Sequence, residues 1–460
     1  MSAPGRQRTC CVEFSRAALL HRAAAQAGAG LPPIEPGMPL PAGTGLDRRS
    51  FLLRSAGLAL AVYGGTRLPL AAFDEGIAAA APADGRVLVS IFLEGGADSI
   101  SVLYPPADPL YRRLRPKLAL PESAGRPFAE DSRLNWHPAA SSLAVLHEEG
   151  KVATLPAVGY TNADQSHFTS RHYYEVGATD ARLQTGWLGR YLDRAGSPDN
   201  PIQGLSLGGA LAPPLATARV PVAAIEAADA YTFSTPGVWG AVETRLHEAV
   251  AAMGAARTTD PQLAGARRVA RQAETLRRQL APFVLNENAR ADGYPQSRDP
   301  FPARLAGLAA MLSAGLPVRC VALEAFGEYD THNNQPNVLA AGLKLTSDSL
   351  LAFQRDLERR GLADRVLLLV WSEFGRRAKE NASRGTDHGA AGIGFVIGTR
   401  VRGQVVGDYP SLSRLDEDGN FRPTSDFRGL YAALLEQWLD ADAAAVLPDA
   451  RRLARPQILR

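Results

Sequence analysis

The sequence contains little cysteine, no block of basic residues and no internal repeat. Its three cysteines are Cys10, Cys11 and Cys320, and the first two lie in a segment that we expect to be removed. A single remaining cysteine excludes an internal disulfide, which fits a protein that folds in the cytoplasm before export. Without clustered lysine and arginine, there is no electrostatic reason to expect nucleic acid as a partner.

The long apolar run of a membrane anchor is also missing near the start of the chain. The stretch SAGLALAVYGG extends for about eleven residues before Thr66, whereas a spanning helix needs roughly 20. It follows RRSFLLR at Arg48–Arg54, and a twin-arginine pair before a weakly apolar segment is an export signal. Small residues at 78–81 offer a cleavage site. The alternative is a chance arginine pair before a buried helix.

These features predict a twin-arginine leader over residues 1–81 and the twin-arginine translocase as a partner during export. The mature protein is expected in the periplasm or outside the cell, without a stable membrane anchor. The leader holds 8 of the 50 Lys and Arg residues and 5 of the 47 Asp and Glu residues, so residues 82–460 carry 42 of each and no net charge. About 380 residues can bury a large core.

Apolar, β-branched runs alternate with helical patterns after the leader. The runs are VLVSIF, KVATLPAVG, RCVALE, VLLLVW and GIGFVI. This alternation predicts an α/β fold with a doubly wound, mostly parallel sheet over residues 82–460. Residues 180–317 break the rhythm with Gly- and Pro-rich segments, and we expect them to form an insertion or cap.

Acidic residues and histidines lie just past several of these runs. Because the carboxyl ends of strands in such a sheet open into one crevice, these side chains are expected to converge on a metal ion. The candidate ligands are Asp98, Asp330, His332, Glu373, Asp387 and His388.

Asp330 and His332 are the strongest pair in this set. If the backbone is extended, residues two apart share a face, and carboxylate plus imidazole suits zinc or another first-row divalent ion. An Asx-type turn at Asp330 is the alternative. Three histidines, His167, His332 and His388, lie in segments around the expected crevice, which favours the metal site.

Glu373 and Asp98 have two interpretations each. Glu373 closes a buried strand, so it must be paired, hydrogen-bonded or bound to metal, and a salt bridge to Arg376 or Arg377 is the alternative to ligation. Asp98 follows a Gly-Gly pair that would let an ion come close to the backbone, although the same letters are typical of an ordinary turn.

Ser166 lies at the expected start of a helix, directly after the second strand and its loop. The free N–H groups of a helix N-terminus stabilise anions, so a hydroxyl there could attack a phosphate or sulfate next to a metal ion. A plain N-cap is the alternative. Ser170 shares that face, and Arg171 could pair with an oxyanion or a carboxylate.

The ordered motifs GG-x-D, SHF, DTH, SEFGR and DHG resemble those of an exported bacterial family called domain of unknown function fifteen-oh-one. The resemblance covers about Arg86 to Leu439. That family is similar in turn to the alkaline phosphatase and sulfatase superfamily. Members of the superfamily use two divalent metals and a nucleophile derived from Ser, Thr or Cys.

The resemblance implies roles for the candidate residues. Asp330, His332 and His388 would hold one metal, whereas Asp98 and Glu373 would hold or imitate a second, with Asp387 as a further candidate ligand. Ser166 would be the nucleophile or position it, and Arg376 would stabilise developing charge. Phe374 replaces a histidine that the superfamily uses as a ligand, which makes a single ion an alternative to two.

The expected function is an exported, metal-dependent hydrolase of phosphate or sulfate esters. Its cofactor would be one or two divalent ions (zinc, manganese or calcium), and its substrate a small molecule or a polymer. The alternative is a non-catalytic exported binding or assembly protein on a degenerate scaffold of the same kind.

Overall fold

The computed structural model describes residues 85–226, 240–259 and 293–460, together with positions 42, 264, 267–268 and 270–272. The predicted leader at 1–81 therefore lies outside the described residues, apart from Ala42. Among the described residues, no helix is both long and apolar enough to cross a membrane.

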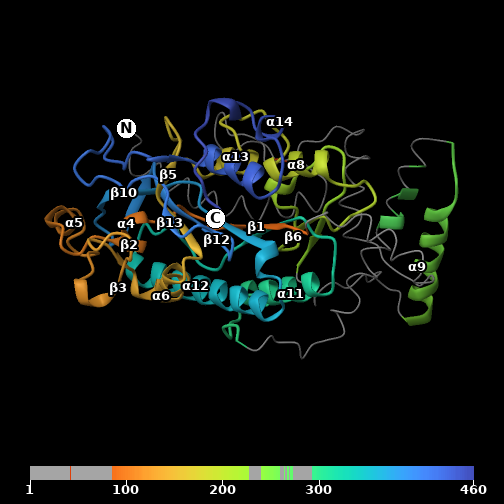
Figure 1. Ribbon diagram of the computed structural model, residues 1–460, viewed down its shortest axis with the longest axis horizontal. Coiled ribbons are helices and arrows are strands. Elements are labelled where there is room, and N and C mark those ends of the chain that lie inside the picture. The colour runs from red at the N-terminus through yellow and green to blue at the C-terminus, as the bar shows by residue number, and fades with distance from the viewer. Residues whose placement is uncertain are drawn as a thin grey trace.

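The main sheet contains nine of the described strands (Figure 1). Its order is β13-β5-β12-β9-β1-β8-β6-β7, and β14 pairs separately with β5. The bounds are β1 Val87–Phe92, β5 Val152–Gly159, β6 Gly204–Leu207, β7 Ala223–Ile225, β8 Cys320–Glu324, β9 Val366–Trp371, β12 Gly392–Ile397, β13 Gln404–Val405 and β14 Ser425–Asp426. All pairings in it are parallel except those of β12 with β5 and β9. The mostly parallel α/β sheet expected from the sequence is confirmed.

Helices cover both faces of this sheet (Figure 1). One layer contains α6 Ser141–Glu148, α11 Phe301–Ser313 and α12 Gln335–Arg359. The other contains α7 His167–Val176, α8 Trp187–Ala195, α13 Phe427–Gln437 and α14 Ala443–Val446. The central strand shows why both layers form. Val89 and Ile91 of β1 pack into the first layer and Leu88 packs into the second, because successive side chains of a strand point to opposite faces.

Smaller elements complete the described fold. A hairpin joins β10 Gly375–Glu380 to β11 Thr386–Gly389, and β2 Leu103–Tyr104, β4 Asn135–Trp136 and β3 Arg126–Pro127 form a small sheet. Two short helices, α4 Ser99–Val102 and α5 Pro109–Leu114, follow β1. Single 3-10 turns are η1 Glu122–Ala124, η2 Pro138–Ala140, η3 Pro213–Leu215, η4 Ala363–Arg365 and η5 Ala450–Arg452.

The stretch 180–317, expected to be an insertion or cap, contributes β6 and β7 to one edge of the main sheet. It also contains α8 and α11, which belong to the two helix layers, and α9 Gly240–Ala255, which lies to one side of the layers in Figure 1.

The direction of β12 decides what gathers at the carboxyl edge of the sheet. Because β12 runs antiparallel to β9, it begins at the edge where β9 ends. The β10–β11 hairpin, which lies between these strands in the chain, is therefore held at the same edge as the loops after β1, β5 and β8.

Candidate metal centre

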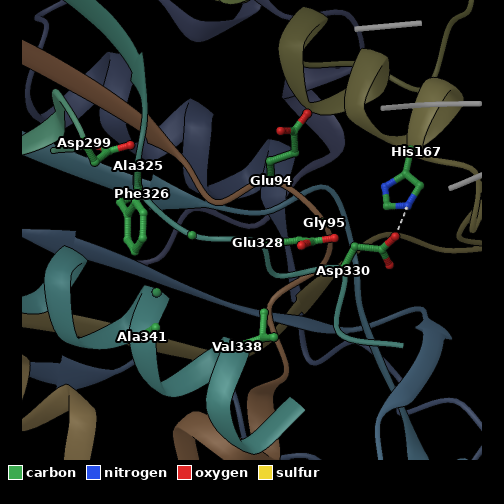
Figure 2. Close-up of a pocket in the computed structure, with 12 residues that line it drawn as sticks. Glu94, Gly95, His167, Asp299, Ala325, Phe326, Glu328, Asp330, Val338 and Ala341 are labelled. Carbon is green, nitrogen blue, oxygen red and sulfur yellow. Dashed lines mark ion pairs between the residues drawn. The ribbon is translucent and has the colours of Figure 1, made fainter. Parts of the chain in front are cut away.

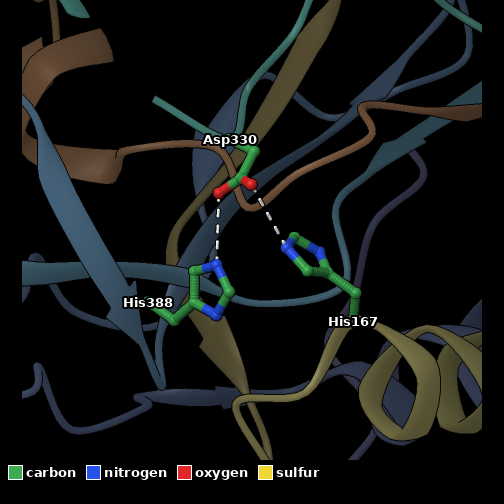
Figure 3. A group of neighbouring side chains, drawn as sticks. All are labelled: His167, Asp330 and His388. Atoms are coloured by element: carbon green, nitrogen blue, oxygen red, sulfur yellow. Dashed lines mark hydrogen bonds and ion pairs between the residues drawn. The ribbon is translucent and has the colours of Figure 1, made fainter. Parts of the chain in front are cut away.

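Three histidines surround the carboxylate of Asp330 at this edge, and Figure 3 shows two of them, His167 and His388. The Nε2 atoms of His388 and His332 each lie 3.1 Å from Oδ1 of Asp330. The Nε2 atom of His167 lies 3.5 Å from Oδ2. Ligand atoms of His167, Asp330 and His388 lie within 4.8 Å of one another, a grouping that could hold a metal ion.

Each of these residues is positioned by a different element. His167 is the first residue of α7, and Asp330 lies in the loop between β8 and α12. His388 lies on β11, directly opposite Arg376 of β10. The N–H of His332 donates to the carbonyl of Asp330 at 2.9 Å, so this loop turns. The backbone there is therefore not extended, but the side chains of Asp330 and His332 still meet.

The second ring nitrogen of each histidine faces a hydrogen-bond acceptor. The Nδ1 contacts are His388 to the carbonyl of Gln165 at 2.8 Å, His167 to Glu373 at 2.8 Å and His332 to Asp387 at 3.1 Å. A backbone carbonyl can only accept, so Nδ1 of His388 must carry its proton, and a neutral ring then leaves a lone pair on Nε2. Acceptors behind Nδ1 are the usual support of histidines that bind metal through Nε2.

This protonation brings electron-rich atoms together. The Nε2 atoms of His332 and His388 lie 3.0 Å apart, and both lie 3.1 Å from Oδ1 of Asp330. Lone pairs at such distances repel one another unless a proton or a metal cation lies between them. Ligand atoms around tetrahedral zinc are separated by about 3.3 Å, given its bond lengths. The donor set and its spacing therefore fit a divalent cation.

In the ion-free site, protons on the histidines balance the charge of Asp330. Burial, the largest influence, lowers the pKa of His388 to about 3, so this ring is neutral near pH 7. Burial also opposes the charged form of His167, but Asp330 and Glu373 outweigh it and raise its pKa to about 9. Although burial alone would raise the pKa of Asp330, Arg376 and the histidines hold it far below its usual range. Without an ion, the proton on His167 thus supplies positive charge beside Asp330.

Arg376 supports Asp330 from the side of the protein interior. Its Nη2 atom donates to Oδ1 of Asp330 at 2.5 Å and to the carbonyls of Tyr329 and Gly95. Its other nitrogens donate to the carbonyls of Gly96 and Thr386, each at 2.9 Å. The side chain is fully buried and orients the Asp330 loop, so the predicted role of Arg376 in stabilising developing charge finds no support in this geometry.

Glu373 lies behind His167. Its buried carboxylate accepts from the N–H of Gly95 at 2.9 Å and of Gly96 at 3.2 Å. Burial opposes its charge, but His167 keeps its pKa below the usual value. Glu373 is thus hydrogen-bonded to Gly95, Gly96 and His167, and among the described residues neither Arg376 nor Arg377 pairs with it.

The Gly-Gly pair serves the protein's own packing. Gly95 and Gly96 have φ of +117° and +88°, a region that favours glycine. A Cβ atom at Gly95 would collide with the backbone nitrogen of Asp330, and one at Gly96 would lie 2.5 Å from the ring of Phe374. That ring packs against His167 and His388, with centroids 4.9 and 4.6 Å apart. Phe374 therefore forms an apolar wall of the site.

Asp98 is not brought to the three histidines. Its side chain, only 1% exposed, forms an ion pair with the buried Arg115 at 2.6 Å. It also accepts from Ser101 at 2.8 Å and from Gln335 at 2.6 Å. A carboxylate this close to a guanidinium is already neutralised, so the predicted role of Asp98 as a metal ligand finds no support in this geometry.

Gln335 links Asp98 to the loop that carries Asp330. Its Oε1 atom accepts from the hydroxyls of Thr331 at 2.9 Å and Thr386 at 2.7 Å. The network therefore fixes the loop and the hairpin from behind.

Ser166 is the N-cap of α7, and its hydroxyl accepts from the N–H of Phe168 at 3.2 Å. It is half-buried and stands between Gln165, which supports His388, and His167. The neighbouring Arg171 pairs with Glu94, Glu175 and Glu324 at 2.8 to 3.0 Å, the carboxylate alternative considered above.

Sequence reasoning placed Asp330, His332 and His388 together and left His167 outside the ligand set. The available signal was its place beside Ser166 in SHF. In the structure, Glu373 and Asp387 are hydrogen-bond partners of His167 and His332.

The family described as protein of unknown function (DUF1501) matches residues 162–427. No curated protein matches the sequence.

Solved structures similar to this chain include a protein of the alkaline phosphatase superfamily from Vibrio parahaemolyticus. It is 10% identical with a TM-score of 0.32, over 88% of this chain and 76% of that one. The C-terminal periplasmic domain of EptC from Escherichia coli, in complex with zinc, is 9% identical with a TM-score of 0.34, over 79% and 87%. The soluble domain of lipooligosaccharide phosphoethanolamine transferase A from Neisseria meningitidis is 10% identical with a TM-score of 0.32, over 81% and 94%. At these TM-scores the chemistry of the site has to be derived from its own residues.

Proposed function

Since this chain belongs to the family of unknown function fifteen-oh-one (DUF1501), whose match spans more than half of it, we propose that it is a metal-dependent hydrolase of phosphate or sulfate esters. The arrangement around Asp330 carries the proposal. Three histidines direct Nε2 toward one carboxylate, and each has an acceptor behind Nδ1. The order of the sequence motifs, which resembles the alkaline phosphatase and sulfatase superfamily, supports the choice of ester.

The ion would be held by His167, Asp330, His332 and His388. When bound, it would polarise a non-bridging oxygen of the ester. Glu373, Asp387 and the carbonyl of Gln165 keep the three rings in the tautomer that ligation requires. Arg376 holds Asp330 in place and donates no hydrogen bond to the substrate.

Ser166 is the proposed nucleophile. Its oxygen would form a bond to phosphorus or sulfur while the bond to the leaving alcohol breaks. The hydroxyl proton would pass to the leaving oxygen, and a water molecule would then release phosphate or sulfate and restore the serine. The N-terminus of α7 favours the negative charge that develops there, because the helix dipole places partial positive charge at this end.

A binding or assembly protein with a structural ion is the second candidate. Four protein ligands already complete a tetrahedral shell, whereas catalytic zinc usually keeps a position for water. Phe374, which packs on His167 and His388, stands where the resemblance places a histidine that would bind a second ion.

Metal analysis combined with an ester screen tests the proposal. Purified protein would be assayed with aryl phosphates, phosphodiesters and aryl sulfates after addition of zinc, manganese or calcium. We expect close to one bound ion per chain and hydrolysis of at least one ester class. Stoichiometric metal with no hydrolysis of any ester would favour the second candidate.

Export by the twin-arginine route remains part of the proposal. The RRSFLLR motif and the short apolar stretch that follows it support a periplasmic or secreted location. The translocase would be a transient partner.

A further inference from the structure

A cavity of about 630 Å³ opens onto the candidate metal centre (Figure 2). His167 and Asp330 form part of its wall, so a molecule in the cavity lies next to the site of the proposed reaction. The chemistry of the remaining wall therefore bears on what the substrate carries beside its ester group.

Carboxylates dominate the polar part of this wall, at Glu94, Asp299, Glu328 and Asp330. Two of them are compensated, because Glu94 pairs with Arg171 at 3.0 Å and Asp330 pairs with Arg376. Within the described residues, Glu328 is exposed and no ion pair involves it or Asp299. The carboxylate of Asp299 accepts only the N–H of Phe301, at 2.8 Å. Among the described residues, no cation therefore balances the carboxylates of Glu328 and Asp299.

The apolar part of the wall contains an aromatic ring. Phe326 lines the cavity together with Ala325, Val338 and Ala341. The loop that carries Phe326 approaches α12 closely, since a Cβ atom at Gly327 would lie 2.6 Å from the Cα of Gly342. An aromatic face beside carboxylates is the combination that binds ammonium groups, because both attract positive charge.

A second cavity of about 530 Å³ adjoins the first and shares Glu94, Asp299 and Ala325 with it. His172 lies in its wall and is 2% exposed. Neither ring nitrogen of His172 has a hydrogen-bond partner among the described residues, and a buried polar group without one is costly. A ligand that extends into this space could supply the missing hydrogen bond.

We propose that the substrate is an ester that also carries an ammonium group, which binds between Phe326, Glu328 and Asp299 while the ester lies at the metal centre. This inference rests on the proposed function and narrows its substrate class. The uncompensated carboxylates would repel a phosphate or sulfate without such a group and would offset the cost of desolvating a cation.

Two phosphodiesters of equal shape would test the inference. The first is 4-nitrophenyl phosphorylcholine, and the second is 4-nitrophenyl 3,3-dimethylbutyl phosphate, in which carbon replaces the quaternary nitrogen. We expect the metal-loaded protein to hydrolyse the choline ester with a kcat/KM about tenfold higher, in line with one cation–π contact and one charge pair.

Charge-removing variants then assign the preference to the cavity. Glu328→Gln and Asp299→Asn should each lower the ratio of the two kcat/KM values several-fold. The matched control is Glu417→Gln, an exposed glutamate outside the cavity, which should leave that ratio unchanged. A preference that survives both cavity substitutions would overturn the inference, and so would equal rates for the two esters.

Calorimetric titration separates this inference from the proposed function. Choline is expected to bind the metal-loaded protein, more tightly than 3,3-dimethylbutanol and more weakly to Glu328→Gln. Such binding without hydrolysis of any ester would overturn the proposed function and leave the ammonium site standing. Hydrolysis of both esters at one rate without choline binding would overturn only the inference, and failure of both measurements would overturn both.

Discussion

At His388 one hydrogen bond decides which nitrogen faces the site. The carbonyl of Gln165 fixes the proton on Nδ1, so Nε2 presents its lone pair to Asp330. Glu373 and Asp387 accept from Nδ1 of His167 and His332, so Nε2 is the nitrogen that these two rings also direct toward Asp330. Substitutions of the histidines and substitutions of the residues that hydrogen-bond to their Nδ1 atoms should therefore have different effects.

Replacing a candidate ligand should reduce the bound metal more than replacing the residue that hydrogen-bonds to that ligand. We expect His332→Ala to lose most of its bound ion, and Asp387→Asn to bind about 10 to 100 times more weakly. Metal content after dialysis and competition with a chelator would measure both. His172→Gln, on the same helix as His167 but outside the centre, should retain the ion. Equal metal content in His332→Ala and the unaltered protein would remove His332 from the site.

A substitution at Ser166 distinguishes a catalytic role of its hydroxyl from a role as the N-cap of α7. If its hydroxyl is the nucleophile, Ser166→Ala should abolish ester hydrolysis while the free energy of unfolding falls by only about 0.5–2 kcal/mol from the lost N-cap. Asp442→Ala is a suitable control, because Asp442 caps α14 by accepting from Ala444 at 2.9 Å. The control should lose similar stability and keep its activity. Hydrolysis that persists in Ser166→Ala would exclude the serine from the mechanism.

The pair of Asp98 and Arg115 should control acid stability. Burial alone would raise the pKa of Asp98, but Arg115 and its hydrogen bonds hold it below the usual value. Since the folded pKa is depressed, this stabilisation is complete above the unfolded value of about 3.9 and is lost as the pH falls through the folded pKa.

Asp98→Asn should lower the free energy of unfolding by about 3–5 kcal/mol at pH 7, since it leaves Arg115 buried without its counter-charge. Denaturant unfolding from pH 7 to pH 3 would measure it. The difference between the two proteins should shrink at the acid end. A difference below about 1 kcal/mol at pH 7 would mean that the pair contributes little.

At the scale of elements, the loop after β1 depends on two glycines. Gly95→Ala would push its Cβ into the backbone of Asp330, so it should displace that carboxylate and lower metal content although Gly95 is not a ligand. Gly315→Ala is the matched control, with φ of +77° and nothing within 4 Å of the added Cβ. It should lose about 1–2 kcal/mol from the left-handed backbone alone and keep its metal. Normal metal content in Gly95→Ala would show that the loop can yield.

The elements that sequence reasoning found are those with long, β-branched runs. VLVSIF and VLLLVW are buried along their whole length and form β1 and β9 as expected. Strands β6 and β7, with 4 and 3 residues, are too short to show a pattern, and the region around them was expected to be an insertion or cap. The β10 strand GRRAKE carries four charged residues, so nothing in it indicates a strand. Local sequence does not contain the register that pairs Arg376 with His388.

The same limit applies to the site. Asp330 and His332 are close in sequence, and His388 lies in the segment between the runs VLLLVW and GIGFVI, so their meeting could be predicted. Asp98 looked equivalent, but its partner Arg115 lies in a charged loop that offers no signal. Whether a carboxylate binds a metal ion or pairs with an arginine depends on contacts between residues that are distant in the sequence. A single sequence does not reveal these contacts.

For the whole molecule, the candidate metal centre exists only after folding. Its residues come from the loops after β5 and β8 and from the hairpin between β9 and β12, which the sheet brings to one edge. An unfolded chain therefore has no site to load. A route that exports folded proteins, as the twin-arginine leader predicts, would let the ion bind in the cytoplasm before export.

Replacing Arg48 and Arg49 together by lysine tests that sequence of events. The translocase reads the arginine pair, whereas lysine keeps the charge and leaves the folded domain untouched. The variant should stay in the cytoplasm with its leader uncleaved, and it should carry as much metal as the exported protein. Cell fractionation, mass measurement of the purified chain and metal analysis would check the three outcomes. Delivery of the variant to the periplasm at the normal level would contradict the predicted route. Retention in a folded but metal-free form would mean instead that the ion is acquired after export.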